Sequence, residues 1–197
     1  MASWNQHQRK ATDRESILEW AQGAVSDPNV VFLDTETTGI GKSAEVVDIA
    51  VLATDGTELL DTLVKPRQPI PADASRIHGI YDHHVASAPR WEQVFPQLLD
   101  VIAQRRVVVY NADYDQGVIA QCCQVCGLSL PLSRWDCAMK AYAAFVGEPS
   151  SHSRAGYRWF KLDQAAAAFG IKPGGHRAAA DAEACRLAVH AMALVER

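Results

Sequence analysis

Apolar residues in the first third of the chain follow the spacing of β-strands. The apolar run at residues 30–33 leads directly into Asp34 and predicts a buried strand. Residues 46–53 and 58–64 predict two more strands, and the Asp-Gly pair within residues 54–57 is typical of a tight hairpin between them. We therefore expect three antiparallel strands that follow one another along the chain.

The rest of the chain alternates between helical spacing and loop signals. Apolar residues three or four positions apart predict helices, and a short apolar run predicts one more strand. The expected helices cover residues 91–103, 112–126, 136–146, 162–169 and 178–195, and the expected strand covers residues 106–110. Residues 65–90, which contain four prolines, and residues 147–160 predict loops. A strand meander followed by alternating strands and helices indicates a mixed α/β sheet with helices packed on its faces.

The N-terminal segment predicts a short helix outside this sheet. Residues 1–11 are polar, and we expect them to be frayed. Thr12 and Glu15 form a capping-box pattern, and apolar residues at helical spacing follow until a Ser-Asp-Pro-Asn turn ends the helix. We therefore divide the chain into an N-terminal extension with a short amphipathic helix, residues 1–28, and a main domain, residues 29–197.

Composition and charge narrow the class of protein. The 197 residues are 48% hydrophobic and 21% charged, which is ordinary for a soluble globular protein. No apolar run reaches membrane-spanning length and no secretory signal is visible, so we expect a cytoplasmic protein without a membrane partner, with its five cysteines as reduced thiols. The net charge of −4 argues against a protein that coats nucleic acid through a basic surface. It does not argue against a protein that holds a few nucleotides through cations bound in an acidic site.

Two carboxylates stand at the end of the first predicted strand. Asp34 and Glu36 are two positions apart, so they project from the same face of a strand. Their repulsion destabilises the fold unless cations neutralise it, and hard cations such as Mg²⁺ or Mn²⁺ prefer oxygen ligands. The Thr37-Thr38-Gly39 segment that follows lets a ligand approach the backbone closely. Taken alone, the segment is equally compatible with an acidic strand end that opens a polar turn.

A second acidic pair follows the strand predicted at residues 106–110. Asn111 is placed as a helix N-cap, and Asp113 and Asp115 then lie in the first turns, where the helix dipole stabilises negative charge. That stabilisation alone can account for both aspartates. If one of them binds a metal ion, the spacing does not decide which one.

A histidine and an aspartate form the third polar group. His176 and Asp181 are five positions apart, which in one continuous helix places them on different faces. They converge only if His176 lies in the loop before the helix, as the Pro173-Gly174-Gly175 segment favours. A histidine in such a loop is commonly just solvated, whereas a carboxylate within an alanine-rich helix contributes nothing to packing.

Taken together, the three polar groups resemble the three motifs of the DEDDh exonucleases. The motifs read Asp34-x-Glu36-Thr-Thr-Gly39, Asn111-Ala-x-Tyr114-Asp115 and His176-x-Ala178-x-x-Asp181. The resemblance runs from about residue 30 to the C-terminal helix and includes residues 77–80, 135–137, 162–163 and 169–171. The chain departs from the family at two positions: Cys137 stands where the family usually has threonine, and Tyr114 where it more often has phenylalanine. The family has a ribonuclease-H-like fold and includes the DnaQ-like proofreading ε subunit of bacterial DNA polymerase III, ribonuclease T and oligoribonuclease.

The resemblance implies a metal-dependent 3′–5′ exonuclease that releases nucleoside 5′-monophosphates. It assigns two divalent cations, Mg²⁺ or Mn²⁺, to Asp34, Glu36, Asp115 and Asp181, and so selects Asp115 rather than Asp113. It assigns His176 the role of general base, which suits a side chain that accepts protons near neutral pH.

Contacts to the terminal nucleotide are expected beside the metal ligands. The backbone of Thr37, Thr38 and Gly39 is expected to hold it, with Ile40 wedged against its base and Tyr114 stacked on it. Core packing explains Ile40 and Tyr114 equally well.

A loop further along the chain combines cations with aromatic residues. Arg158 lies there with Arg154, Tyr157 and Trp159, a mixture that suits single-stranded nucleic acid. An ordinary amphipathic loop has the same composition.

Two other features are interpreted as structural. Cys122, Cys123 and Cys126 fall within a predicted helix, where core thiols are favoured over a zinc site. Asp48 lies within an apolar strand, where it either supports the metal ligands or is exposed.

The expected substrate is the 3′ end of single-stranded DNA, and a polymerase or repair protein is a candidate partner. The same site would serve a ribonuclease that trims short RNA or RNA 3′ ends, because contacts to the 2′-hydroxyl are not legible in the sequence. A non-catalytic nuclease-like module is the other alternative, although the four carboxylates and the histidine are all retained. The chain ends soon after its last predicted helix, without the long tail of the ε subunit, so we expect a free-standing nuclease or one that docks through its N-terminal extension. The sequence does not indicate an oligomeric state.

Overall fold

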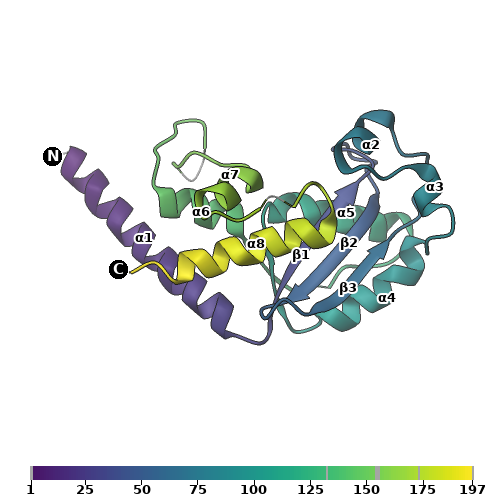
Figure 1. Cartoon of the computed structure of the whole chain (residues 1–197), viewed down its shortest axis with the longest axis horizontal. Coiled ribbons are helices and arrows are strands. Elements are labelled where there is room, and N and C mark those ends of the chain that lie inside the picture. The colour runs from purple at the N-terminus through teal and green to yellow at the C-terminus, as the bar shows by residue number, and fades with distance from the viewer. Residues whose placement is uncertain (1, 132, 154–155, 173, 197) are drawn as a thin grey trace.

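A five-stranded mixed sheet forms the centre of the molecule (Figure 1). The computed structural model describes residues 2–196 except 132, 154, 155 and 173, with side chains from residue 12 onward. The strands are β1 (Val30–Thr37), β2 (Val46–Ala53), β3 (Glu58–Leu63), β4 (Arg106–Val109) and β5 (Arg134–Cys137), in the order β3-β2-β1-β4-β5. β1 pairs antiparallel with β2 and parallel with β4, so the predicted meander and the predicted mixed α/β sheet are confirmed.

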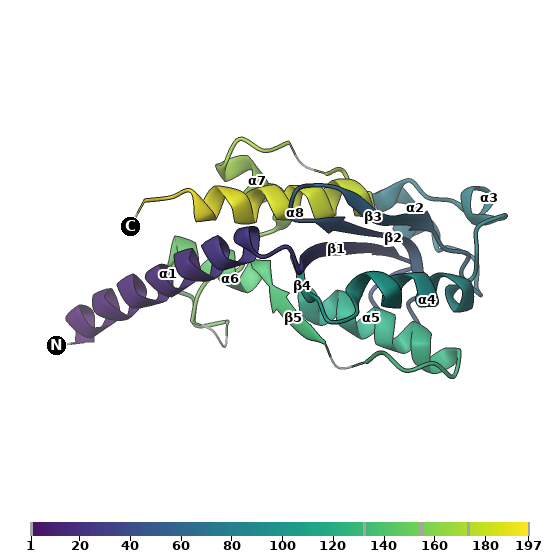
Figure 2. The same ribbon diagram turned by 90° about the horizontal axis from the view of Figure 1, so that it is seen from below.

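Helices cover both faces of the sheet (Figure 2). One face is covered by α4 (Trp91–Ile102) and α5 (Ala112–Val125), and the other by α8 (Ala178–Ala193) with α1 (Ala2–Ser26), α6 (Ala138–Val146) and α7 (Leu162–Ala168). Two short helices, α2 (Ala72–His78) and α3 (Asp82–Val85), lie between β3 and α4. All five cysteines are free thiols, as predicted.

The alternation of side chains along β1 assigns its residues to the two faces. Val31 and Leu33 pack in the core beneath α4 and α5, whereas Phe32 packs in the core formed with α1 and α8. Both faces are covered, which explains the continuous apolar run. The next two positions in the row of Phe32 are Asp34 and Glu36, so strand geometry directs both carboxylates toward the side of α8.

The structure contains elements that the apolar pattern did not indicate. The segment predicted as a loop at residues 65–90 includes α2 and α3. β5 pairs parallel with β4, and α6 begins at Ala138 rather than at residue 136. β5 has four residues, each at least partly exposed, so its strand form depends on pairing with β4 rather than on an apolar pattern of its own.

The N-terminal extension forms one long helix that is partly integrated into the main domain. α1 begins at Ala2, so the prediction of a frayed segment before residue 12 was wrong. Leu18, Ala21 and Ala24 are buried, and the Trp20 indole donates a hydrogen bond to Asp136 Oδ2 over 2.9 Å. The N-terminal part of α1 extends away from the sheet (Figures 1 and 2). Among the described residues, no helix has the length and apolar character needed to cross a membrane.

Candidate active site

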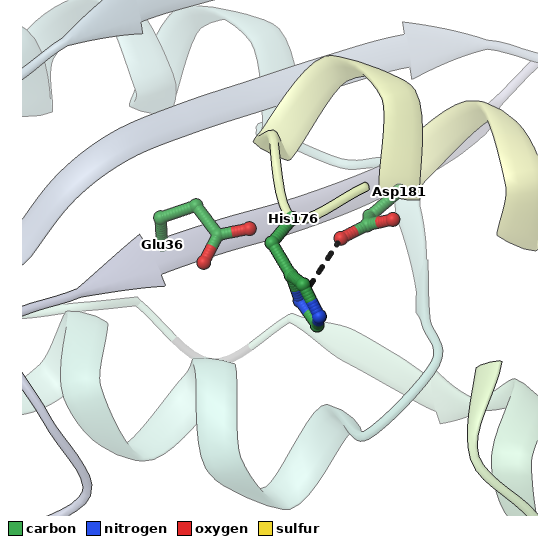
Figure 3. Close-up of side chains that lie close together, drawn as sticks. All are labelled: Glu36, His176 and Asp181. Atoms are coloured by element: carbon green, nitrogen blue, oxygen red, sulfur yellow. Dashed lines mark ion pairs between the residues drawn. The ribbon is translucent and has the colours of Figure 1, made fainter. Parts of the chain in front are cut away.

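Residues from β1 and from the start of α8 meet at the end of the sheet (Figure 3). Glu36, His176 and Asp181 each present one donor atom, and these atoms all lie within 4.8 Å of one another. His176 Nδ1 lies 4.0 Å from Asp181 Oδ2. Glu36 of β1 therefore faces the third motif, as the strand alternation requires.

A tight turn before α8 makes this convergence possible. His176 lies outside the helix, as predicted, and adopts a left-handed backbone conformation with φ of 59°. Gly174 approaches α8 so closely that a Cβ there would overlap Asp181 Oδ1 and would lie 2.6 Å from the carbonyl carbon of Ala180. The sequence indicated a loop here, but it did not indicate that Gly174 is required by its approach to a carboxylate.

Asp115 reaches the same cluster from the opposite face of the sheet. It is buried in the first turns of α5, and Thr35 Oγ1 donates a hydrogen bond to its Oδ1 over 2.7 Å. Asp113 is exposed and forms an ion pair of 2.6 Å with Lys140. The helix rotation thus directs Asp115 inward and Asp113 outward, in agreement with the choice implied by the family resemblance.

Burial and mutual repulsion raise the pKa of the carboxyl groups in this cluster. Burial is the largest cause for Asp34, whose pKa lies well above its usual value, and the charges of Asp115, Asp181 and Glu36 raise it further. Burial, followed by the charge of Asp181, raises the pKa of Glu36 to about 8. Burial raises the pKa of Asp115 to about 7 and raises that of Asp181 above its usual value. Four carboxylates therefore influence one another in a small volume, which is unfavourable in their charged form without a compensating cation.

The donor set fits divalent cations. Carboxylate oxygens are the ligands that Mg²⁺ and Mn²⁺ prefer, and an imidazole is present within the same group of donor atoms. The cluster lines a cleft of about 640 Å³. Its other walls come from Thr35, Tyr110, Asn111, Tyr114, Met139, Trp159, Phe160, Lys161, Leu162, Asp163 and Gln164.

The segment after β1 is braced against the cleft by a tyrosine. The Tyr114 hydroxyl donates a hydrogen bond of 2.8 Å to the Gly39 carbonyl and lies 2.5 Å from Thr37 Oγ1. Thr38 Oγ1 accepts a hydrogen bond from the Glu45 amide over 2.9 Å. Ile40 is 93% exposed, so core packing does not explain it.

Of the residues grouped in the cation-aromatic loop, Trp159 lines the cleft and Arg158 does not. Arg158 pairs with Glu148 over 3.0 Å and lies over the Phe160 ring, and it is not among the residues that line the cleft. Tyr157 is buried. Trp159, half exposed, lines the cleft instead. Arg154, which the sequence grouped with them, lies outside the described residues.

A buried ion pair holds the start of α8. Asp48 is 1% exposed, and its Oδ2 accepts hydrogen bonds from Arg177 Nε over 2.9 Å and from the Ala178 amide over 3.4 Å. Asp48 lies opposite Glu36 in the β1–β2 pairing. Of the two roles considered for Asp48, exposure is wrong, and its charge within an apolar strand was the signal for a buried partner.

The sequence of this chain is similar to known exonucleases. Residues 31–188 match the RNase_T family, described as exonuclease. An uncharacterized exonuclease of Escherichia phage 186 is 42% identical over 165 residues, which cover 80% of this chain and 82% of the phage protein. The DNA polymerase III ε subunit of Pasteurella multocida is 29% identical over 97 residues, which cover 44% of this chain and 38% of that protein.

Solved structures show the same fold. Exonuclease X in complex with 5′-overhanging duplex DNA has a TM-score of 0.57 and 27% identity, and the match covers 83% of this chain and 90% of that one. The nuclease domain of 3′hExo, a DEDDh family member bound to rAMP, has a TM-score of 0.65 at 19% identity over 82% of this chain and 90% of that one. The predicted ribonuclease-H-like fold is thus confirmed, and divalent metal ions are typical of this family. The chain belongs to the RNase_T exonuclease family and is a DnaQ-like, DEDDh-type 3′–5′ exonuclease that acts on nucleic acid.

Proposed function

We propose that the enzyme removes nucleotides one at a time from the 3′ end of single-stranded nucleic acid, with DNA preferred over RNA. The products are nucleoside 5′-monophosphates and a strand shortened by one nucleotide with a free 3′-hydroxyl. One observation carries this proposal: carboxylates from β1, α5 and α8 converge with a histidine in a single cleft.

Two divalent cations, Mg²⁺ or Mn²⁺, would be held by Asp34, Glu36, Asp115 and Asp181. When bound, they would supply positive charge for the scissile phosphate and the leaving 3′-oxygen and would make water more acidic. The raised pKa values support this assignment, because the carboxylates lack nearby positive charge sufficient to stabilise their ionised forms. A bound cation would relieve the repulsion among the carboxylates, and this relief would contribute to the free energy of cation binding.

His176 would act as the general base. Its side chain is 55% exposed at the mouth of the cleft, where an attacking water can reach it. The imidazole would take one proton from that water as the oxygen attacks phosphorus. The bond from phosphorus to the 3′-oxygen of the penultimate nucleotide would break, and that oxygen would take a proton from solvent to become the free 3′-hydroxyl.

The terminal nucleotide would lie between the segment after β1 and the loop before α7. The brace formed by Tyr114, Thr37 and Gly39 keeps that backbone in place, and Ile40 extends beyond it as an exposed apolar side chain. Trp159 offers an aromatic surface on the opposite wall, on which a base can stack. We therefore assign Trp159, in place of Arg158, to substrate contact.

The preference for DNA rests on similarity alone. Exonuclease X, whose solved structure contains duplex DNA, is 27% identical to this chain, and several further relatives are subunits of DNA polymerase III. RNA trimming uses the same cleft, so it remains the competing substrate class.

The proposal is tested with matched DNA and RNA oligonucleotides labelled at either end, incubated with Mg²⁺, Mn²⁺ or EDTA. We expect immediate release of the 3′ label as a mononucleotide, a ladder of 5′-labelled products, and no cleavage in EDTA. Asp34→Ala should abolish cleavage without unfolding the protein, whereas the exposed Asp113→Ala should be fully active. Cleavage by Asp34→Ala would overturn the assignment, and binding without cleavage in the unmodified protein would favour a non-catalytic module.

A further inference from the structure

A second cavity lies on the α4 and α5 side of the sheet, apart from the catalytic cleft. Its volume is about 370 Å³, at the lower end of the range of small-molecule sites. Four segments line it: the loop between β1 and β2, the chain after β3, the first residues of α4 and the last turns of α5. No residue of the catalytic cluster lines this cavity.

The walls of this cavity carry an excess of positive charge. Its cations are Lys42, Lys65, Arg67 and Arg90, and its carboxylates are Glu45 and Glu92. Both carboxylates are engaged: Glu45 accepts hydrogen bonds from the backbone amides of Arg67 and Gln68, and Glu92 pairs with Arg67 over 2.9 Å. Within the described part of the chain, neither Lys42 nor Arg90 forms an ion pair. A local excess of cations is therefore available to an anion, although the whole chain has a net charge of −4.

Two further features suit a ligand that joins a phosphate to an apolar group. The 12-residue helix α4 begins at this cavity with Trp91, so its positive dipole end would favour an anion bound there. Val125, 56% exposed, and the buried Trp91 provide apolar wall. A nucleotide combines a phosphate with a sugar and a base in this manner.

The cavity is connected to the catalytic cleft by two continuous elements. α5 carries Tyr114 and Asp115 at the cleft and Val125 at the cavity, a separation of about 15 Å along the helix axis. In the loop between β1 and β2, Gly39 is hydrogen-bonded to Tyr114 of the cleft, the exposed Ile40 comes next, and Lys42 lines the cavity. A strand whose 3′ end occupies the cleft would therefore pass Ile40 and reach the cavity within a few nucleotides.

We propose that this cavity is a second nucleotide subsite, which binds a phosphate and its nucleoside at an internal position of the strand being degraded. The inference rests on the proposed exonuclease function and adds to it a preference for strands long enough to span both sites. Its phosphate contacts are Lys42 and Arg90, with Lys65 and Arg67 contributing charge. Strands that fill both sites gain affinity, and shorter substrates are cleaved through the cleft alone.

The test compares the double variant K42Q/R90Q with the control R105Q/R134Q, which also removes two cations, one just before β4 and one at the start of β5. Arg134 is 69% exposed, and its contact with Asp136 is 3.5 Å long. Each variant is assayed on a single-stranded oligonucleotide of about 12 nucleotides and on the p-nitrophenyl ester of thymidine 5′-monophosphate, which is too small to reach the cavity. For K42Q/R90Q we expect KM for the oligonucleotide to rise about tenfold with kcat unchanged. We also expect the slope of log affinity against log salt to decrease by about 0.7, since the subsite binds one phosphate and each neutralised phosphate contributes about 0.7 for single strands. Hydrolysis of the ester should stay within about twofold of wild type, and the control should match wild type on both substrates.

Three results would overturn the inference. If KM and the salt slope are unchanged in K42Q/R90Q, the cavity does not bind the strand. The same conclusion follows if KM and the salt slope change equally in R105Q/R134Q. If thymidine 5′-monophosphate binds wild type at the cavity and K42Q/R90Q loses only that binding, the ligand is a free nucleotide rather than the strand. If wild type hydrolyses neither substrate, the proposed function itself fails. That outcome differs from one in which wild type is active and K42Q/R90Q has the same KM as wild type.

Discussion

Replacement of Gly174 by alanine isolates the contribution of the turn before α8 to the catalytic cluster. Gly174 adopts an ordinary φ, so the substitution introduces no left-handed strain at this position. The added methyl group collides instead with the carboxylate of Asp181 and with the first turn of α8. Because Asp181 is assigned to metal binding, the effect should appear in catalysis as well as in stability.

The size of the effect follows from the distances. An ideal Cβ on Gly174 lies 2.6 Å from the Ala180 carbonyl carbon, and ordinary van der Waals contact begins at 3.4 Å, so the turn or α8 must move by about 0.8 Å, which is 3.4 minus 2.6. A displacement of about 1 Å near reacting atoms can cost about a hundredfold in rate, and overpacking costs about 1–3 kcal/mol. For a chain of this size, that destabilisation lowers Tm by about 2–12 °C.

Gly175→Ala is the matched control. Gly175 has a φ of 75°, but a Cβ there meets no heavy atom within 4 Å. Alanine in the left-handed region costs about 1–2 kcal/mol, so both variants should lose comparable stability. Gly175→Ala should keep kcat/KM within about threefold of wild type, because it does not displace Asp181.

The assay measures kcat/KM on a single-stranded oligonucleotide, the concentration of Mn²⁺ required for half-maximal activity, and Tm for both variants. Gly174→Ala should reduce kcat/KM about a hundredfold and should require more metal. If Gly174→Ala folds and matches Gly175→Ala in both activity and metal requirement, the close approach to Asp181 does not matter for catalysis, and the reasoning is refuted.

Three other perturbations test the electrostatics and the walls of the cleft. Metal-free protein should lose stability as the pH rises from about 4.5 to about 8, because folding raises the pKa of Glu36 to about 8 and the folded state then binds protons that the unfolded state has released. Tm measured in EDTA across this range tests the trend, and saturating Mg²⁺ should reverse it. A Tm that rises with pH in EDTA would contradict the prediction. Asp48→Ala should lower kcat about 10–100-fold with little change in KM, because Asp48 positions Arg177 at the start of α8. Asp48→Asn keeps an acceptor oxygen and should recover part of the lost activity. Equal activity of Asp48→Ala and wild type would exclude a positioning role. Trp159→Ala should raise KM for oligonucleotides about tenfold while kcat is unchanged, since one stacked base contributes about 1–3 kcal/mol; an unchanged KM would place the base elsewhere.

Local periodicity was sufficient for much of the fold. The apolar runs before Asp34 and the Asp-Gly hairpin predicted the meander, because strands buried on both faces and tight turns each require particular residue types. The same periodicity could not reveal β5, whose four residues form a strand only through pairing with β4. It also placed the start of α6 two residues too early for the same reason.

The sequence predicted which residues belong to the candidate site better than it predicted how their side chains are arranged. Strand alternation placed Asp34 and Glu36 together, and the glycine-rich segment placed His176 before the helix. Spacing alone left Asp113 and Asp115 equivalent, and helix rotation against the sheet separated them.

The sequence by itself determined the elements of the sheet, the three polar motifs and the family to which they point, because those depend on residues near one another in the chain. The tertiary structure alone decided which polar side chains share a cavity. It buried Asp48 against Arg177, directed Trp159 rather than Arg158 into the cleft, and gathered Lys42 and Arg90 at a second cavity. The physical reason is that charge, burial and steric approach act between side chains that are close in space, and residues many positions apart acquire that closeness only when the sheet and its helices pack together.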